Sequence, residues 1–228
     1  MKILFDELFK DATVTATNES LNYPVLNIVH PWLHKRFQST STGSLITATF
    51  TDDQCMDCFF YAYHDLTALS VVYKDSGGST LATVSITDPD DIGIEYFTQL
   101  TTVRSVEITI TGTYIGKIGG GCCYTMPDVN ADYTSGNIDN SNGPSSAYGQ
   151  RLVNNVPKLR NLSYSFRELT LTLRNEIDAL YTSDNIFFDL YENNRTKEPP
   201  IYGFFRRPFN FTYNPRRYSL NMQIEEAK

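Results

Sequence analysis

The stretch SVEITIT at residues 105–111 decides the fold class. Val106, Ile108 and Ile110 alternate with Glu107 and Thr109, and this period of two is typical of a strand with one buried face. Comparable apolar runs recur along the first half of the chain, at residues 44–50, 58–63, 68–73 and 80–87.

These runs are spaced by about ten residues. They are separated by turn sequences such as Ser76-Gly77-Gly78 and Asp88-Pro89-Asp90-Asp91. Several short strands with turns between them predict a β-sandwich. We therefore expect a mainly β protein whose N-terminal domain is a sandwich.

Charge is unevenly distributed along the 228 residues, and the net charge is −7. Residues 1–150 hold 7 Lys and Arg against 17 Asp and Glu, whereas residues 151–228 hold 12 against 9. Nucleic-acid binding needs a concentrated basic patch, so we expect no nucleic-acid partner. The asymmetry favours contacts between unlike protein surfaces, although two solvated surfaces would give the same count.

The sequence lacks an apolar run of the roughly 20 residues that a membrane helix needs, so no membrane partner is expected. The opening residues reach Asp6 after a short apolar run. That run is too short for the core of a signal peptide, so we do not expect export by the usual route.

A compositional break lies between residues 128 and 150, where 12 of 23 residues are Gly, Ser, Asn or Pro. Such a segment buries too little apolar surface to offset the entropy lost on ordering. We therefore expect a flexible linker or arm at 128–150, between a sandwich domain at 1–127 and a second domain at 151–228.

The second domain has a different pattern. Leu173, Ile177, Leu180 and Tyr181 share one face of a helix, with Thr172 as a candidate N-cap. The alternation of Leu169, Leu171 and Leu173 also fits a longer preceding strand, so the start of the helix stays open. Strands are predicted at residues 162–166, 186–191, 201–205 and 209–213, and in a closing run in which Tyr218, Leu220, Met222 and Ile224 share one face. These elements predict a small α+β domain with one helix on an antiparallel sheet.

Four arginines precede this closing strand: Arg206, Arg207, Arg216 and Arg217. Guanidinium groups make bidentate contacts with carboxylates, so we expect these residues at an interface with an acidic neighbour. The alternative is a solvated charged edge that discourages unwanted strand pairing.

Four cysteines form two groups, Cys55-x-x-Cys58 and Cys122-Cys123. Four thiols are the right number for zinc, but adjacent residues on a strand point to opposite sides and fit one tetrahedral site poorly. Reduced structural thiols, a disulfide formed outside a reducing cytoplasm, and a metal site all stay open.

Other candidate chemistry is weaker. His30 and His34 have the spacing of helical metal ligands, but Pro31 argues against a helix there. Asp88, Asp90 and Asp91 fit a turn better than a calcium site. No nucleophile motif stands out, so we expect no enzyme activity and no cofactor.

The front half resembles the galactose-binding-like (discoidin-type) jelly roll found in virion proteins of tailed phages. The resemblance is carried by Tyr23-Pro24-x-x-Asn27, by His64-Asp65-Leu66-Thr67, where Asn is usual at position 65, and by Tyr114-Ile115-Gly116-Lys117. The closing RRYSLNMQIEEA at 216–227 is similar to the end of the same phage proteins.

This resemblance implies a structural, distal-tail-like protein of the tail tip or baseplate, assembled in the host cytoplasm and located in the virion. Its implied partners are itself, in a ring that is hexameric if distal-tail-like, and other tail proteins. The alternative is a carbohydrate-binding module that contacts host surface glycans.

Overall fold

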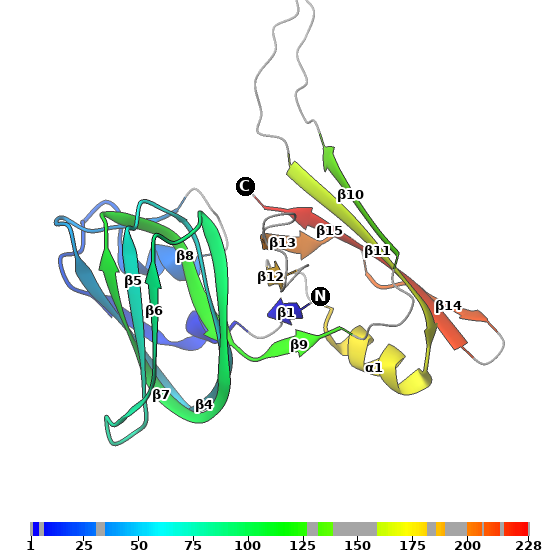
Figure 1. Ribbon diagram of the computed structural model, residues 1–228, viewed down its shortest axis with the longest axis horizontal. Helices are drawn as coiled ribbons and strands as arrows, with labels where there is room; N and C mark the ends of the chain where they lie inside the picture. The colour runs from blue at the N-terminus through cyan, green and yellow to red at the C-terminus, as the bar shows by residue number, and fades with distance from the viewer. Residues whose placement is uncertain are drawn as a thin grey trace, which may run out of the picture. The chain divides into compact units, whose positions relative to one another are not determined.

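The computed structural model describes residues 2–4, 7–30, 35–126, 132–138, 159–181, 186–189, 200–206, 208–214 and 217–227. Over these ranges the chain is mainly antiparallel β-strand with one α-helix, which confirms the predicted fold class. The chain divides into two compact units (Figure 1). Unit 1 comprises residues 1–126 and 186–202, and unit 2 comprises residues 127–185 and 203–228.

Two long strands build the sandwich of unit 1: β4 (Ser44–His64) and β7 (Ile92–Thr111). They pair antiparallel from one end to the other, with register shifts between Thr49 and Cys58. The runs predicted at 44–50 and 58–63 are therefore parts of one strand.

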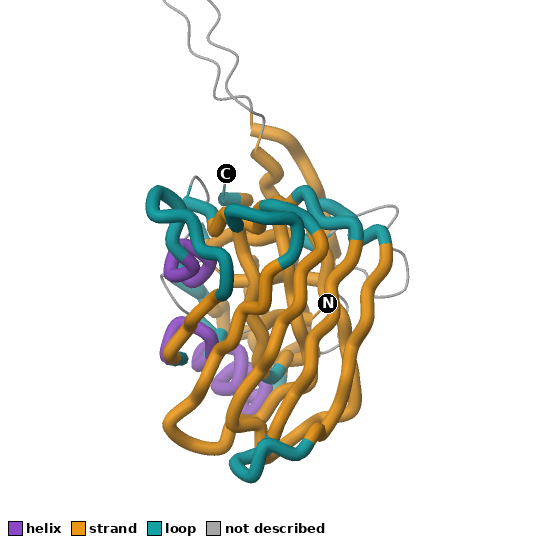
Figure 2. Tube along the Cα trace, turned by 90° about the vertical axis from the view of Figure 1, so that its left-hand side faces the viewer, coloured by secondary structure: helices purple, strands orange, loops and turns teal. Residues whose placement is uncertain are grey.

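Different strands extend the sheet on either side of the two halves of this strand pair. β2 (Thr13–Ala16), β5 (Ala68–Lys74) and β6 (Thr80–Thr87) extend the sheet around the first half of β4, and β8 (Tyr114–Gly121) and β3 (Phe37–Gln38) extend it beside the second half. Ile46 and Val71 from the first group share one buried core with Phe59 and Ile115 from the second. In Figure 2 the strands of unit 1 run side by side, with loops gathered at the two ends.

The second half of β4 is buried on both faces. Phe59 faces the sandwich core, whereas Phe60 stacks on Phe187 at a centroid distance of 4.3 Å. Phe187 lies on β12 (Ile186–Asp189), which pairs antiparallel with β1 (Lys2–Leu4), and β1 pairs in turn with β9 (Cys123–Thr125). The neighbouring residue on β8 is Gly119, where an added Cβ would collide with the Phe60 ring. Glycine is thus needed for this aromatic ring to lie flat against β8.

Two short 3-10 helices complete unit 1. The first, η1 (Leu8–Asp11), is capped by the carboxylate of Glu7, which accepts hydrogen bonds from the amides of Phe9 and Lys10. The second, η2 (Val25–Val29), buries Val25 and Ile28.

Unit 2 is centred on β15 (Arg217–Glu226), which pairs antiparallel with β11 (Leu159–Leu169). β11 also pairs with β10 (Asp132–Ile138). On its other side β15 pairs with β14 (Phe211–Asn214) and with the end of β13 (Ile201–Phe205). Leu220, Met222 and Ile224 are buried, as the alternation predicted.

The helix of unit 2, α1, spans Leu171–Ala179 and follows directly from β11. The predicted cap Thr172 is wrong, because the cap is Thr170, whose hydroxyl accepts a hydrogen bond from the amide of Leu173 at 3.2 Å. Glu168 before it has a φ of 61°, where the pairing of β11 shifts register. The helix buries Ile177, and Leu180 just beyond its end is buried too.

The division of the chain differs from the expected boundaries in two respects. Residues 186–202, placed in the second domain by sequence, belong to unit 1 because β12 pairs with β1. Part of the predicted linker, residues 132–138, is strand β10. The rest of 128–150 lies outside the described residues. Among the described residues no helix is long and apolar enough to cross a membrane.

Candidate functional site

The outward face of unit 2 is lined by hydroxyl and amide side chains. Alternation along β15 places Leu220 inward and Ser219, Asn221 and Gln223 outward. Neighbouring β11 contributes Ser163, whose hydroxyl lies 3.0 Å from Oδ1 of Asn221. This face therefore presents side chains that can donate and accept hydrogen bonds.

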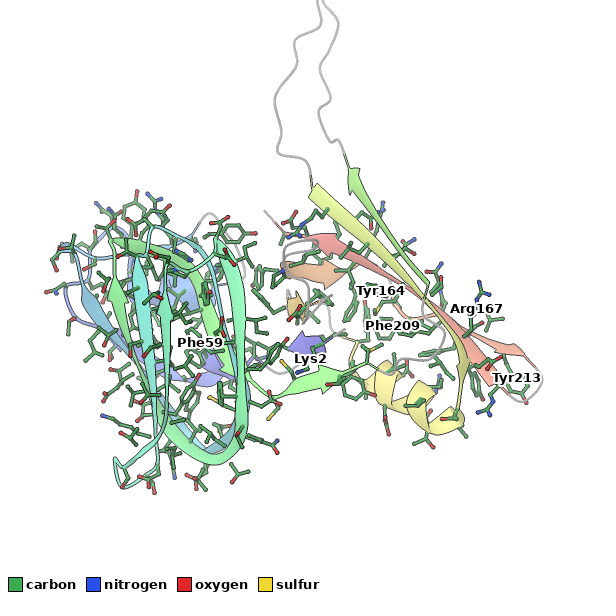
Figure 3. All side chains as sticks on the ribbon, in the orientation of Figure 1. Lys2, Phe59, Tyr164, Arg167, Phe209 and Tyr213 are labelled. Carbon is green, nitrogen blue, oxygen red and sulfur yellow. The ribbon has the colours of Figure 1, made fainter. Side chains whose placement is uncertain are left out.

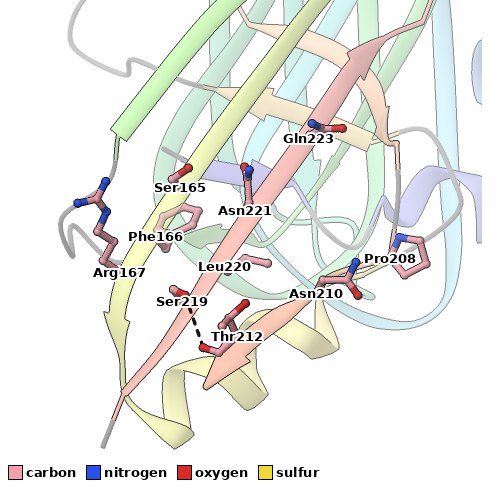
Figure 4. A pocket seen from close by; sticks show the side chains of 10 residues that line it. All are labelled: Ser165, Phe166, Arg167, Pro208, Asn210, Thr212, Ser219, Leu220, Asn221 and Gln223. Carbon is pink, nitrogen blue, oxygen red and sulfur yellow. Dashed lines mark hydrogen bonds between the residues drawn. The ribbon is translucent and has the colours of Figure 1, made fainter. Parts of the chain in front are cut away.

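A pocket of about 450 Å³ lies on this face (Figure 4). Its polar lining comes from β11, β14, β15 and the segment before β14, and includes Arg167, Asn210, Thr212 and Asn221. Phe166 and Leu220, both buried, contribute its apolar part. The arrangement suits a ligand that has hydrogen-bonding groups and carries negative charge near Arg167.

An aromatic surface, defined here as Leu171, Arg174, Tyr181, Phe211, Tyr213 and Tyr218, is contributed by α1, by Tyr181 just after its end, by β14 and by the start of β15. Tyr213 is 64% exposed and Leu171 58%. Tyr213 packs against Tyr218 at 5.1 Å between ring centroids, and the guanidinium of Arg174 lies 4.9 Å from the Phe211 ring. Figure 3 shows Tyr213 and Arg167 at the surface of unit 2. Exposed tyrosine and arginine are the residue types that dominate the binding energy of protein interfaces.

The four candidate interface arginines have different outcomes. Arg217 is exposed at the start of β15, beside the aromatic surface. Arg206 is also exposed, and its Nε lies 3.7 Å from a carboxylate oxygen of Glu225 in the same unit. Arg207 and Arg216 lie outside the described residues.

The four cysteines form two close pairs in unit 1. The Sγ atoms of Cys55 and Cys122 are 2.8 Å apart, and those of Cys58 and Cys123 are also 2.8 Å apart. Among the described residues, the donor atoms that could share one metal ion are those of Asp57, Cys58 and Cys123. Cys55 and Cys122 do not join that group, so the four thiols do not converge on one point.

The other weak candidates are held in local contacts. The ring of His64 accepts a hydrogen bond from the amide of Leu66 and lies 2.9 Å from the carbonyl of Asp90. Nε2 of His30 lies 3.1 Å from Nζ of Lys35. His34 lies outside the described residues. Asp88, Asp90 and Asp91 form no candidate metal group among the residues described.

The three motifs that carry the family resemblance meet at one end of the sandwich. Arg36 lies over the ring of Tyr114 at 4.6 Å and 5.5 Å from the ring centroid of Tyr23, and these three residues form the tyrosine–arginine cluster. The side-chain amide of Asn27 donates to the carbonyl of Arg36 at 2.9 Å. Oδ1 of Asp65 accepts from the backbone amides of Thr113 and Tyr114, at 2.8 Å each.

Buried charge underlies this end of the sandwich. Lys117 is 2% exposed, and its ammonium donates to the carbonyls of Asn27 and His30. Burial lowers the pKa of Lys117 to about 8, although the negative charge of Glu7 opposes that change. Burial also raises the pKa of Glu7 to about 7, against the hydrogen bonds from Phe9 and Lys10. The motif residues thus fix the backbone of η2 and β8, and Arg36, Tyr23 and Tyr114 are the side chains they present.

Comparison with known proteins finds no match in sequence and a likeness in structure over part of the chain. No family model and no curated protein matches the sequence. Solved structures that resemble about half of the chain include the following three. The lectin domain of lectinolysin complexed with Lewis B antigen has 9% identity and a TM-score of 0.45, over 50% of this chain and 95% of its own. A *Streptococcus pneumoniae* fucose binding module, SpX-3, has 10% identity and a TM-score of 0.46, over 53% and 99%. Chitosan-binding module 1 of a *Paenibacillus* chitosanase/glucanase has 13% identity and a TM-score of 0.43, over 53% and 99%.

Sequence reasoning missed the aromatic surface and the polar pocket. The exposed Tyr213 sits in a run, FNFTYN at 209–214, that reads as an ordinary strand with buried aromatics. Only the structure shows that β14 is a short strand paired on one side within the described residues, which leaves Tyr213 uncovered.

Proposed function

We propose that the protein is a non-catalytic structural subunit that assembles with copies of itself and with other proteins in the tail tip of a tailed phage. The place in a virion rests on the sequence resemblance carried by residues 23–27, 64–67, 114–117 and 216–227. The mode of action, protein–protein contact through unit 2, rests on the exposed aromatic surface.

The single observation that carries the contact is the exposure of Tyr213 and Leu171 beside Arg174 and Arg217. Large apolar side chains left in water favour burial against a partner, by about 25 cal/mol for each Å² of apolar surface removed. The flanking guanidinium groups would select a partner that supplies carboxylates.

A second copy of this chain can supply those carboxylates. Unit 1 holds 9 Lys and Arg against 17 Asp and Glu, whereas unit 2 holds 10 against 9. A head-to-tail contact between unit 2 of one subunit and unit 1 of the next would therefore join unlike charges. Repeated contacts of this heterologous kind close into a ring when the rotation permits.

The absence of catalysis is part of the proposal. Both ring nitrogens of His64 are engaged by the backbone of its own unit, and His30 lies against Lys35, so neither stands ready as a general base. The polar pocket of unit 2 is lined by amides, hydroxyls and one arginine, groups that bind a ligand without activating a nucleophile.

Substitution of the aromatic surface tests the proposal. We expect the purified wild-type chain to form rings visible by mass photometry and negative-stain electron microscopy. Tyr213→Ala combined with Arg217→Glu should weaken assembly at least tenfold in the required concentration, while circular dichroism stays unchanged. Ser163→Ala is the matched control, because Ser163 lies on β11 of the same unit, on the polar face with Asn221 and outside the aromatic surface.

Two results would contradict the proposal. One is a strictly monomeric wild type at every concentration and salt level. The other is normal assembly of the double variant, which would place the interface elsewhere.

A second candidate function, glycan binding by unit 1, is favoured by the tyrosine–arginine cluster. Tyr23 is 38% exposed, and its ring and that of Tyr114 flank a guanidinium at one end of the sandwich. Aromatic rings beside hydrogen-bond donors are suited to sugar faces and hydroxyl groups. A glycan array with wild type and Arg36→Ala decides it: loss of a reproducible signal in the variant supports glycan binding, and no signal above background with wild type refutes it.

A further inference from the structure

The cysteines of unit 1 carry an inference that is independent of assembly. Cys55 and Cys58 lie on β4, and Cys122 and Cys123 lie at the junction of β8 and β9. β4 and β8 are direct neighbours, with Cys58 opposite Gly121. Residues 65 and 67 positions apart in sequence are thereby brought within reach of one another.

Alternation explains why the thiols pair as they do. Cys55 and Cys58 are three positions apart and Cys122 and Cys123 are one position apart. Because both offsets are odd, the two side chains of each group point to opposite sides of an extended chain. Each side then receives one thiol from β4 and one from the β8–β9 junction. Cys55 meets Cys122 on one side, and Cys58 meets Cys123 on the other, both with Sγ atoms 2.8 Å apart.

A shared metal ion does not account for both pairs. The group that could hold one contains Cys58, Cys123 and Asp57, and it leaves out Cys55 and Cys122. In addition, Oδ1 of Asp57 already accepts a hydrogen bond from the amide of Cys123 at 2.8 Å. A closed structural zinc site uses four ligands, and the described part of the chain places no such set on either side.

We propose that Cys55–Cys122 and Cys58–Cys123 are two disulfide bonds that fasten β4 to the β8–β9 junction. The present separation of the sulfur atoms is 2.8 Å. A covalent S–S bond is about 2.05 Å long, so closure needs less than about 1 Å of movement at each pair.

The chemistry is thiol–disulfide exchange with a low-molecular-weight disulfide such as oxidised glutathione. At each pair two S–H bonds break and one S–S bond forms. The two protons and the two electrons pass to the sulfur atoms of the oxidant, whose S–S bond breaks and which leaves as two thiols. Such oxidants prevail outside the reducing cytoplasm, so both bonds form after the protein leaves the cell.

Closure should be slow at neutral pH. Burial and the contact with Cys55 raise the pKa of the Cys122 thiol to about 12. The contact with Cys123 and burial raise the pKa of Cys58 as well. Because the thiolate is the attacking species, these thiols exchange more slowly than exposed ones.

The two proposed bonds lie close to the point where the chain passes from unit 1 to unit 2. β9 is the last strand of unit 1 before the chain continues into unit 2 at residue 127. Pinning Cys122 and Cys123 to β4 fixes the point at which the chain leaves the sandwich. Tension applied through unit 2 would then meet a covalent anchor instead of the three residue pairs that join β9 to β1.

Mass spectrometry of the whole chain tests the proposal. Protein held in a reductant should take four iodoacetamide labels after denaturation. Protein incubated with oxidised glutathione and then denatured should take none, and its mass should be lower by four hydrogen atoms. The midpoint of thermal unfolding should rise by roughly 10 °C on oxidation, because each bond closes a long loop.

Matched double variants test the pairing. Cys55→Ser with Cys122→Ser, and Cys58→Ser with Cys123→Ser, each leave one proposed pair and should each lose two hydrogen atoms on oxidation. Cys55→Ser with Cys123→Ser leaves Cys58 and Cys122 on opposite sides, and both should stay open to alkylation. The double variants are compared in the reduced state by circular dichroism to verify that all are folded.

Three outcomes would overturn the proposal. The first is full alkylation of the oxidised wild type. The second is disulfide formation in the mismatched variant as fast as in the matched ones. The third is stoichiometric zinc in the purified protein, measured by plasma mass spectrometry, that protects the thiols and is released when they are alkylated.

Discussion

Oδ1 of Asp65 accepts a hydrogen bond from the backbone amide of Tyr114 at 2.8 Å, across 49 positions of sequence. The same carboxylate accepts from the amide and hydroxyl of Thr113. One side chain in the turn after β4 therefore satisfies the backbone at the start of β8. Where the family resemblance leads one to expect asparagine, this chain has the stronger, charged acceptor.

Replacement of this carboxylate should destabilise unit 1. Asp65→Ala leaves two backbone amides without their acceptor, and we expect a loss of about 1–2 kcal/mol in the free energy of unfolding, measured by urea titration. Asp52→Ala, at an exposed position of β4, is the control and should change it by less than about 0.5 kcal/mol.

Acid should remove the same contribution. Burial raises the pKa of Asp65, but the hydrogen bonds from Thr113 and Tyr114 outweigh it, and the net pKa lies below its usual value. A carboxylate with a lowered folded pKa stabilises the fold above its unfolded pKa, and this contribution disappears as the pH falls through the folded pKa. The stability difference between wild type and Asp65→Ala should thus shrink below about pH 4. A constant difference down to the acid transition would show that the side chain acts through shape alone.

Glu7 should give a pH dependence of opposite sign. Burial raises the pKa of Glu7 to about 7 from 4.5, so the folded state holds a proton in this window that the unfolded state has released. Stability from this group is full below the unfolded pKa and is lost as the pH rises to the folded pKa. In Glu7→Gln that loss should be missing, so the variant should gain stability relative to wild type between pH 4.5 and 7. Equal slopes for both proteins would contradict a raised pKa at Glu7.

Gly119→Ala should disturb the packing of β8 on β4. The added methyl group would collide with the Phe60 ring and the carboxylate of Glu7, and overpacking of this kind costs about 1–3 kcal/mol. Gly77→Ala is the control, since its Cβ would meet only a side-chain oxygen of Asp75 at 3.3 Å. Thermal unfolding followed by circular dichroism measures both, and similar midpoints for the two variants would show that Phe60 can move aside.

Leu220→Ala should weaken unit 2 selectively. Leu220 is 2% exposed on β15, and loss of a buried leucine costs about 2–5 kcal/mol. Hydrogen exchange should then speed up in β11 and β15 and stay unchanged in β5. Ser219→Ala, on the outward face of the same strand, should leave all three at wild-type rates. Faster exchange in β5 would mean that the two units unfold together.

The period-two runs predicted most of the strands because burial on one face leaves a direct mark in the sequence. β6 and β13 have the predicted bounds, residues 80–87 and 201–205. The second half of β4 escaped this rule, since both of its faces are covered and Cys58 to Ala62 are all buried. A strand buried on both sides shows no alternation, and periodicity alone does not set its ends.

The site was less predictable than the fold. Alternation indicated that the four cysteines fit one tetrahedral site poorly and left a metal site open, whereas the choice of partner depends on the register of β4 against β8. That register is a long-range property, with Cys58 and Gly121 separated by 63 positions. The exposure of Tyr213 likewise depends on the tertiary packing around β14, and a single sequence carries no signal for that packing.

Because residues 186–202 belong to unit 1, unit 1 cannot finish folding until most of the chain has been synthesised. During synthesis, β1 and β9 are available early, but their partner strand β12 leaves the ribosome only after residues 127–185 of unit 2. Residues 203–228, including β15, follow later still. Phe60 thus has to wait for Phe187 with its ring uncovered, which gives a chaperone a defined interval in which to act. A ribosome stalled between residues 127 and 185 would carry a sandwich that is nearly complete but still exposes an apolar surface at Phe60.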